Sequence, residues 1–355
     1  MTHSTRCILR GQTFTIGLAA TLVLAFLAPE IGATSGLLHP KTTTKLAVAL
    51  VFLIQGVSIP GKQLLQSLAR PKIHVFCLAC NFALAPALMQ LMLSVSSRWI
   101  SPELHPSLLY LSLVPTTISS AIVFTASSGG NRATALFSAT LSNVLGIVAT
   151  PLLCLTLIDL GEPNFPPILP LFGKLALLAL LPLAAGQTVR RLSSIDFDRK
   201  AALLKRAANG LILFIVFVTF CNSMSNESWT RIDAQATILL LAFTLVFLLA
   251  QSSLTWLGAG LVTKDPANRT AAFFCGSQKT LAAGAPMAAI IFSEVGPQTT
   301  GLLILPLIAY HALQLLLAGI ASPALIRRTD RGTSNGPSPA NDREEEDENT
   351  NALKR

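Results

Sequence analysis

A group of hydrogen-bonding side chains interrupts an otherwise apolar stretch at residues 273–288. The nearest charged residues around the group are Arg269, ten positions before Lys279, and Glu294, fifteen positions after it. With a helical rise of about 1.5 Å per residue, Lys279 lies roughly 15 Å from the charged end of this stretch. That depth is near the midplane of a bilayer whose apolar layer is about 30 Å thick. The group consists of Ser277, Gln278, Lys279 and Thr280.

These side chains could bind an ion or a solute inside a membrane. An ionisable group at the bilayer centre costs at least about 2.5–3.5 kcal/mol, so such groups are usually functional. Gly276, Gly284 and Pro286 weaken the helix around the group. Backbone groups freed in this way must face protein or a water-filled cavity. A polar, broken helix near the midplane is typical of the binding sites of secondary transporters.

Three roles remain open for Lys279. Its long stem could carry the ammonium to the membrane interface, but from mid-span it would have to reach farther than its own length. The ammonium could instead be a fixed charge that binds an anionic solute group or takes the place of a coupling cation. It could also exchange a proton, because burial away from water disfavours the charged form. The last two roles are favoured.

A second polar cluster occupies residues 112–121, where Pro115 is expected to kink or break a helix because it lacks an N–H group and clashes with the carbonyl four residues back. Hydroxyl groups in a membrane helix often bond only to their own backbone. Four hydroxyls beside a proline favour a binding site instead. They belong to Thr116, Thr117, Ser119 and Ser120.

The composition is that of a polytopic membrane protein. Of 355 residues, 52% are hydrophobic and only 12% are charged, with a mean hydropathy of +0.60. The charged fraction is about half that of soluble domains. The net charge of +9 comes from short loops between apolar segments, so it indicates topology rather than a nucleic-acid partner. Cys77 and Cys80 have the spacing of a metal or redox pair, but no second pair accompanies them, so we expect packed thiols.

The apolar segments predict ten membrane spans in an all-α fold. The loops that join these spans alternate strictly between the two sides of the membrane, and their lysine and arginine residues divide seventeen to four between those sides. Both termini are therefore expected in the cytoplasm. The spans are 13–31, 44–60, 72–95, 104–127, 131–158, 168–189, 209–225, 237–261, 270–293 and 299–326.

Ten spans divide into two halves of five, which would enter the membrane in opposite senses. The fourth span of each half is the polar, weakened one. We expect a cytoplasmic N-terminus at 1–12, five-helix repeats at 13–158 and 159–326, and a disordered, acidic cytoplasmic tail at 327–355.

At these residues the sequence resembles the bile acid:sodium symporter superfamily, and within it the SBF-like branch named for the seventh bile acid cotransporter. The resemblance covers about residues 10–328. It is carried by PTTISSAIVFTASSGGNRATALFSATLSNVLGIVATPLL (115–153), FCGSQKTLAAGAPMA (274–288) and LPLIAYHALQL (305–315). It implies an inverted five-plus-five repeat, with a panel domain of spans 1, 2, 6 and 7 and a core domain of the others. Spans 4 and 9 would be broken and cross near the middle.

The resemblance also implies site residues. Sodium-coupled members use an amide five residues before a proline in span 3, which Asn81 matches. Of their Ser-Asn pair in span 4, Ser120 is kept and Ala121 replaces the amide. Asn143 matches a hydroxyl of span 5 that lies eight residues before a Pro-Leu-Leu sequence, and Gln278 matches a glutamine of span 9.

The glutamate that bridges two sodium ions in those members has no counterpart here. Its position falls at residues 273–275, and no carboxylate occurs from Thr270 to Phe292. Burying a hard cation without a carboxylate is costly. Na⁺ remains a candidate cofactor, but we do not expect transport to be coupled to sodium. We expect no other cofactor.

We therefore expect a secondary active, symporter-like transporter for an organic, anionic solute. The alternative is a non-transporting membrane regulator or sensor on the same fold. The spans contain no acidic pair, metal-ligand cluster, nucleophile with a base, or nucleotide-binding glycine pattern, so we expect neither an enzyme nor a primary pump. The expected location is the plasma or inner cell membrane, and the expected partners are the bilayer and a small solute.

One further candidate is His311, which shares a helix face with Gln314 in the last span, although a packed core histidine is the favoured interpretation. The candidate substrate- or ion-binding residues are Asn81, Thr116, Thr117, Ser119, Ser120, Asn143, Ser277, Gln278, Lys279, Thr280 and His311.

Overall fold

The described part of the chain is helical throughout. The computed structural model describes residues 3–33, 38–59, 70–96, 98–158, 168–193, 195–224, 234–292 and 297–334, and no strand occurs among them. The prediction of an all-α polytopic membrane protein is confirmed at this level.

Six helices of the described residues are long and apolar enough to cross a membrane. Two of them contain a π-helical turn, at η2 (Cys80–Leu84) and η4 (Ala176–Leu180). The six are α5–η2–α6 (Pro71–Ala79, Cys80–Leu84, Ala85–Val95), α9 (Arg132–Leu157), α10–η4–α11 (Ile168–Leu175, Ala176–Leu180, Leu181–Leu192), α12 (Ala201–Met224), α13 (Ala234–Val262) and α16 (Pro297–Ser334).

Two of the remaining predicted spans fall on helices whose apolar segments are shorter. α1 (His3–Leu27) and α3 (Pro40–Ser58) each contain a shorter apolar segment, and α2 (Pro29–Gly32) lies between them. The arrangement is consistent with ten spans, but the ten-span repeat itself stays a prediction.

Two helices are interrupted in mid-course. After η3 (Pro102–Leu104), α7 (His105–Leu113) ends just before Pro115, and α8 (Ser119–Ser127) begins after an extended link. The break predicted at this proline is therefore present. α14 (Pro266–Ser277) and α15 (Leu281–Ile291) are separated by residues 278–280.

Pro286 does not break its helix, although the sequence suggested that it would weaken it. It lies inside α15. A proline leaves the carbonyl four residues earlier without its helical donor. Here that carbonyl belongs to Ala282, and it accepts a hydrogen bond from Gln55 Nε2 of α3 at 3.4 Å. A donor from a neighbouring helix thus keeps α15 intact.

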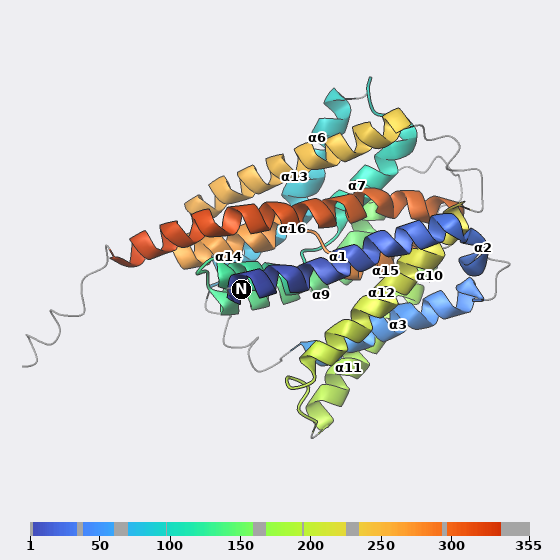
Figure 1. Ribbon diagram of the computed structural model, residues 1–355, viewed down its shortest axis with the longest axis horizontal. Coiled ribbons are helices and arrows are strands. Elements are labelled where there is room, and N and C mark those ends of the chain that lie inside the picture. Colours follow the sequence, from blue (N-terminus) through green and yellow to red (C-terminus); the bar gives the residue numbers. More distant parts are fainter. Residues whose placement is uncertain are drawn as a thin grey trace, which may run out of the picture.

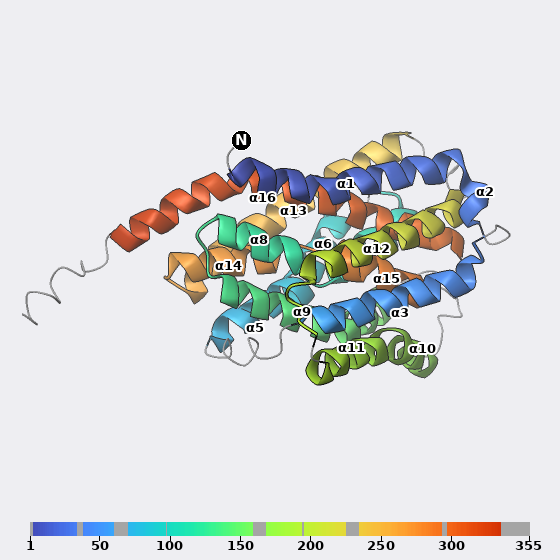
Figure 2. The ribbon, with the colours of Figure 1, turned by 60° about the horizontal axis from the view of Figure 1, so that its bottom comes forward.

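The helices form two groups, as Figure 1 shows. α3 lies between α11 and α12 on one side of the molecule, and α13, α14 and α16 pack together on the other. Figure 2 places α10 and α11 at the outer edge of the first group. The first group touches the rest of the molecule chiefly where α12 contacts α15 and α16. We call the first group, with α1, the panel group.

Small residues allow the closest helix approach in the panel group. Gly56 of α3 faces Gly186 of α11, and a Cβ atom on Gly56 would overlap the carbonyl oxygen of Leu183. Arg190 Nη1 of α11 also donates to Val57 O at the end of α3, at 2.8 Å. These contacts fix α3, and with it Gln55, against the rest.

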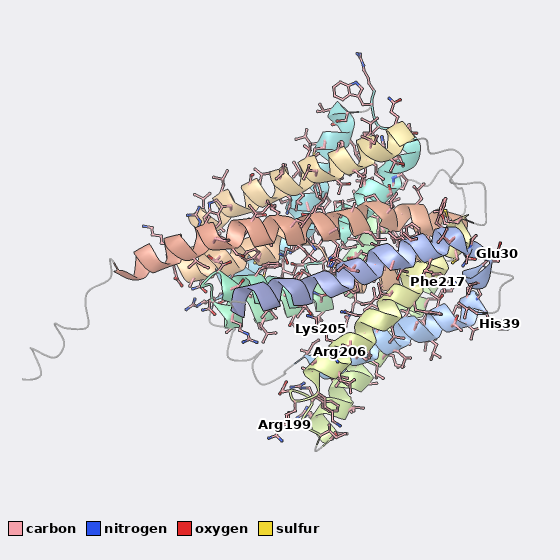
Figure 3. All side chains as sticks on the ribbon, viewed as in Figure 1. Glu30, His39, Arg199, Lys205, Arg206 and Phe217 are labelled. Atoms are coloured by element: carbon pink, nitrogen blue, oxygen red, sulfur yellow. The ribbon has the colours of Figure 1, made fainter. Side chains whose placement is uncertain are left out.

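The outer surface is apolar along the helices and charged at their ends. Leu261 is 90% exposed, and Leu192 and Ile320 are similarly open, as lipid-facing residues of a membrane protein are. In Figure 3, Arg199, Lys205 and Arg206 lie near one end of the panel group, at the bottom of the view, and Glu30 and His39 lie near its other end, at the right.

The predicted domain boundaries are not tested by the helices. α16 continues to Ser334, past residue 326 where the second repeat was expected to end. The remainder of that tail lies outside the described residues.

Candidate functional site

The link between α14 and α15 is extended and is held on both edges. Gln314 of α16 binds the Lys279 backbone through two hydrogen bonds: its Oε1 accepts from Lys279 N at 2.7 Å, and its Nε2 donates to Lys279 O at 2.8 Å. The next amide, Thr280 N, donates to Pro115 O in the other interrupted helix at 2.9 Å. The two breaks therefore meet at one place, which we call the crossing.

The Lys279 side chain points away from solvent and is 0% exposed. Its Nζ donates to three backbone carbonyl oxygens: Asn81 O at 3.0 Å, Ser112 O at 2.7 Å and Val114 O at 3.0 Å. In this conformation the ammonium does not extend to the interface. Because an ammonium has three N–H groups, all of its donors are engaged.

Two prolines explain why these carbonyls are free. In η2, Ala85 N donates to Cys80 O, five residues back, so the next amide in the pattern would donate to Asn81 O. That residue is Pro86, which has no N–H. Pro115 likewise cannot continue α7, so the carbonyls at the end of that helix lack helical donors. The sequence thus creates acceptors, and Lys279 supplies donors.

Neutral side chains complete the end of α7 and its link. Thr150 Oγ1 of α9 donates to Leu113 O at 2.8 Å. Asn143 Nδ2 donates to Thr116 O at 2.7 Å, and Thr116 N donates to Ser142 Oγ at 3.3 Å.

Three other helices complete the end of α14. Asn81 Nδ2 donates to Cys275 O at 2.9 Å, Gln251 Nε2 to Gly276 O at 3.0 Å and Tyr310 Oη to Ser277 O at 2.6 Å. Each of these three carbonyls is therefore bound by a different element, η2, α13 or α16.

The start of α8 is the accessible part of the crossing. Ser119 is exposed and Ser120 is partly exposed. The Ser120 hydroxyl lies 2.9 Å from Gln278 Oε1, to which it donates, and 3.2 Å from Thr117 Oγ1. The Gln278 Nε2 donor is buried and has no hydrogen-bond partner in the part of the chain that the structure describes.

Other predicted residues have mainly structural contacts. Ser277 Oγ donates to Phe273 O of its own helix at 2.7 Å. Thr280 is the N-cap of α15, with its hydroxyl accepting from Ala283 N at 3.4 Å. His311 Nδ1 lies 3.0 Å from Gln314 Nε2, so this histidine supports the residue that binds the Lys279 backbone.

Several residues of the crossing were not predicted. Gln251 and Tyr310 bind the end of α14, and Ser142 and Thr150 bind the end of α7 and its link. An amide in the middle of an apolar span, as at Gln251, is a signal that could have been used. The carbonyl of Asn81 could also have been found, from the proline five residues later.

No metal centre is visible in the described ranges, because no three histidine, cysteine, aspartate or glutamate side chains there are grouped so that they could hold a metal ion. Cys77 and Cys80 are free, buried thiols.

An all-helical membrane protein whose two interrupted helices meet at a buried, polar crossing has the construction of a secondary transporter. Comparisons with known proteins agree. A model of the SBF-like CPA transporter family matches residues 12–327. The chain therefore belongs to this family, as the motifs indicated, and is a membrane transporter rather than an enzyme.

Named relatives have similar length. Sodium/bile acid cotransporter 7-B of Xenopus laevis is 33% identical over 323 residues, covering 89% of this chain and 92% of that protein. Sodium/bile acid cotransporter 7 of Rattus norvegicus is 32% identical over 322 residues, covering 89% and 93%. An uncharacterized protein of Pseudomonas aeruginosa is 30% identical over 321 residues, covering 90% and 94%.

Proposed function

We propose that this protein is a secondary active transporter for an organic anion, whose acidic group binds at the first turn of α8. The observation that carries the proposal is the Gln278 side chain. It is only 2% exposed, yet its Nε2 donor has no hydrogen-bond partner among the described residues. Its Oε1 accepts from Ser120 in the first turn of α8. A donor for an anion therefore lies beside the start of this helix.

The start of α8 offers further donors. The first N–H groups of a helix have no partner within that helix and carry partial positive charge. α8 has no side-chain N-cap, and Ser119 at its start is exposed. A carboxylate or sulfonate there would accept hydrogen bonds from backbone amides, as anions do at helix N-termini.

The charge around the crossing also favours an anion. No aspartate or glutamate occurs at residues 104–158 or 266–293. Lys279 is fully buried there. Its three N–H groups are engaged, so it contributes through its field rather than through a direct contact, and such fields are strong in a low-dielectric interior.

The other candidate residues then hold the crossing in shape. We assign direct solute contacts to Ser119, Ser120 and Gln278. The supporting residues are Asn81, Thr116, Thr117, Asn143, Ser277, Lys279, Thr280 and His311.

Uptake into proteoliposomes tests this function. The named relatives are called bile acid cotransporters, so labelled taurocholate is the first probe, followed by a panel of smaller organic acids. We expect accumulation or counterflow of at least one acid, with weak or no dependence on Na⁺, because residues 270–292 contain no carboxylate that could bind the ion. A steep, sigmoidal Na⁺ activation would contradict the proposed coupling. Folded protein that moves none of the acids would favour the regulator or sensor.

A charge change at Gln278 tests the binding position. Gln278→Glu places a carboxylate beside the start of α8, where it would occupy the donors meant for the solute. We expect uptake to fall at least about tenfold, the effect of losing about 1.4 kcal/mol. Ser127→Ala at the far end of α8 is the control, because among the described residues its hydroxyl donates to Phe124 O of its own helix, at 3.1 Å. Equal uptake by both variants would remove Gln278 from the site.

The proposed topology is ten spans in an inverted repeat at 13–158 and 159–326, in the plasma or inner cell membrane, with both termini cytoplasmic. The seventeen-to-four charge distribution supports it. Reporter fusions at residue 355 and within 226–236 should lie on opposite sides of the membrane, and fusions on the same side would exclude ten spans.

A further inference from the structure

The surroundings of the Lys279 ammonium are those of a bound monovalent cation. Its ligands are three backbone carbonyl oxygens, at 2.7, 3.0 and 3.0 Å from Nζ. Carbonyl oxygens are also the ligands that replace the water shell of alkali cations in selective channels. No other type of ligand contacts the ammonium among the described residues.

The charge balance is that of a cation site without an acid. The sequence has no carboxylate at residues 71–102, 104–158 or 266–293, which contain Lys279 and the three carbonyl groups that it binds. Two of the three carbonyls, Ser112 O and Val114 O, lie at the C-terminal end of α7. A helix C-terminus carries partial negative charge and is stabilised by a cation. The ammonium is therefore compensated by carbonyl dipoles.

The contacts join three interrupted segments. Asn81 lies in the π-helical turn between α5 and α6, the α7 carbonyls lie at the first break, and Lys279 itself lies at the second break. Without a cation at this position, Asn81 O, Ser112 O and Val114 O would face one another in a buried space. An unsatisfied, buried carbonyl is strongly unfavourable. A cation is thus needed to hold these three segments together.

We propose that Lys279 is a covalently attached substitute for a dissociable cation, and that its ammonium permanently fills a monovalent-cation site that binds the two broken helices together. Such a cation cannot leave during a transport cycle, so no ion gradient drives the transporter through this position. The inference rests on the proposed transport only for this last consequence.

Chemical complementation tests the proposal on the purified full-length chain. Lys279→Ala keeps the Cβ atom and removes the remainder of the side chain, which corresponds to propylammonium. Thermal unfolding is measured at constant chloride concentration with propylammonium, Na⁺, K⁺, tetramethylammonium or N-methylglucamine as the cation. Tetramethylammonium carries the charge but has no N–H group, so it is the control for ionic strength.

For Lys279→Ala we expect a lower Tm than wild type and a saturable rise with propylammonium. The rise should be at least about 2 °C, the shift that a binding free energy near 1 kcal/mol gives. Wild type and Lys174→Ala, which changes a lysine of α10 away from the crossing, should show no such rise. Three results would overturn the proposal: an alanine variant as stable as wild type, a Tm rise with tetramethylammonium as large as that with propylammonium, or no Tm rise with any of the cations.

A second variant covers the case in which the alanine protein does not fold. Lys279→Met fills the apolar path of the lysine stem without a charge, so it should be unstable and should gain nothing from propylammonium. A methionine variant as stable as wild type would overturn the proposal. If Lys279→Ala aggregates, membranes are solubilised with each cation present, and a monodisperse peak with propylammonium alone supports the cation site. Aggregation with every cation counts against it.

These measurements separate the inference from the proposed function. Stability and its rescue by an amine do not require a known solute, so they stand if no uptake is found. Conversely, uptake by wild type with no amine effect on the alanine variant would retain the transporter and discard the substituted cation. If Na⁺ or K⁺ also stabilises Lys279→Ala, the emptied site accepts alkali cations, which supports the proposal further.

Discussion

The two interrupted helices are completed in different ways. At the first break, the end of α7 is bound by the Lys279 ammonium and by Thr150. At the second, the end of α14 is bound by three neutral side chains from three elements. The helix starts differ as well: Thr280 caps α15, whereas α8 has no side-chain cap. At the second break, both the end of α14 and the start of α15 are bound by neutral side chains. At the first break, the end of α7 is bound by a charged group, and the start of α8 is uncapped.

The local sequences explain this difference. Pro115 removes a donor from the end of α7 and leaves several acceptors close together, which suits a single cation with three N–H groups. The second link has no proline between Ser277 and Leu281, so its backbone N–H groups can donate hydrogen bonds. Lys279 N donates to Gln314 Oε1, and Thr280 N donates to Pro115 O. Loss of the ammonium should therefore damage the first break more than loss of any single neutral donor damages the second.

The largest effect is expected for Lys279→Met. It leaves Asn81 O, Ser112 O and Val114 O without donors, at about 1–3 kcal/mol for each unsatisfied group. We expect a loss of stability of about 3 kcal/mol or more, together with loss of transport, measured by thermal unfolding and uptake on the same preparation.

Arginine at this position refines the interpretation. Lys279→Arg keeps a charge that does not dissociate, but its planar fork does not match three converging carbonyls. Intermediate stability with partial transport is expected for a fixed charge. If the lysine exchanged a proton instead, arginine would abolish proton-coupled uptake as completely as methionine. A stable and active methionine variant would show that the ammonium has no role at the crossing.

The next effect is expected for Gln251→Leu at the second break. Gln251 Nε2 donates to Gly276 O at 3.0 Å and to Cys80 O at 3.1 Å, so leucine leaves two buried carbonyls without this donor. We expect a loss of about 2 kcal/mol, measured as a lower Tm. Gln235→Leu is the control, because this residue is exposed on the same helix. A larger loss at Gln251 than at Lys279 would reverse the order of the two breaks.

A matched pair of smaller effects compares one neutral donor at each break. Tyr310→Phe removes the hydroxyl that binds Ser277 O, and Thr150→Val removes the one that binds Leu113 O. Each should cost about 1 kcal/mol. Thr150→Val should be the milder change, because Lys279 still binds the carbonyls on either side. Tm values of the two variants on equal backgrounds give the comparison, and a larger loss for Thr150→Val would contradict it.

The positions of Lys279 and of the break at Pro115 could be predicted from the sequence, but most of the side chains that bind the broken helix ends could not. A mid-span lysine and a proline in an apolar segment are local signals, so Lys279 and the break at Pro115 could be located. The donors from Gln251 and Tyr310 depend on tertiary packing, which spacing does not show. Pro286 was expected to weaken its helix, but Gln55 of another helix binds the freed carbonyl.

Hydroxyl groups were the least predictable. Ser277 and Ser120 have the same chemistry and both lie near a break, yet Ser277 bonds to its own helix and Ser120 bonds across the crossing to Gln278. Only the relative positions of α8 and the second link decide between these outcomes.

The smallest effect on stability is expected for Ser120→Ala at the uncapped side of the first break. Ser120 is partly exposed, so water can replace its hydroxyl, and the loss should be within about 0.5 kcal/mol. Its donation to Gln278 Oε1 at 2.9 Å orients that amide, so the unpartnered Nε2 should lose its fixed direction. We expect an unchanged Tm with a three- to tenfold higher half-saturating solute concentration, corresponding to about 0.7–1.4 kcal/mol. Ser127→Ala should change neither quantity. If Ser120→Ala lowers the Tm while solute affinity stays the same, the start of α8 is a structural joint like the second break, and the solute binds elsewhere.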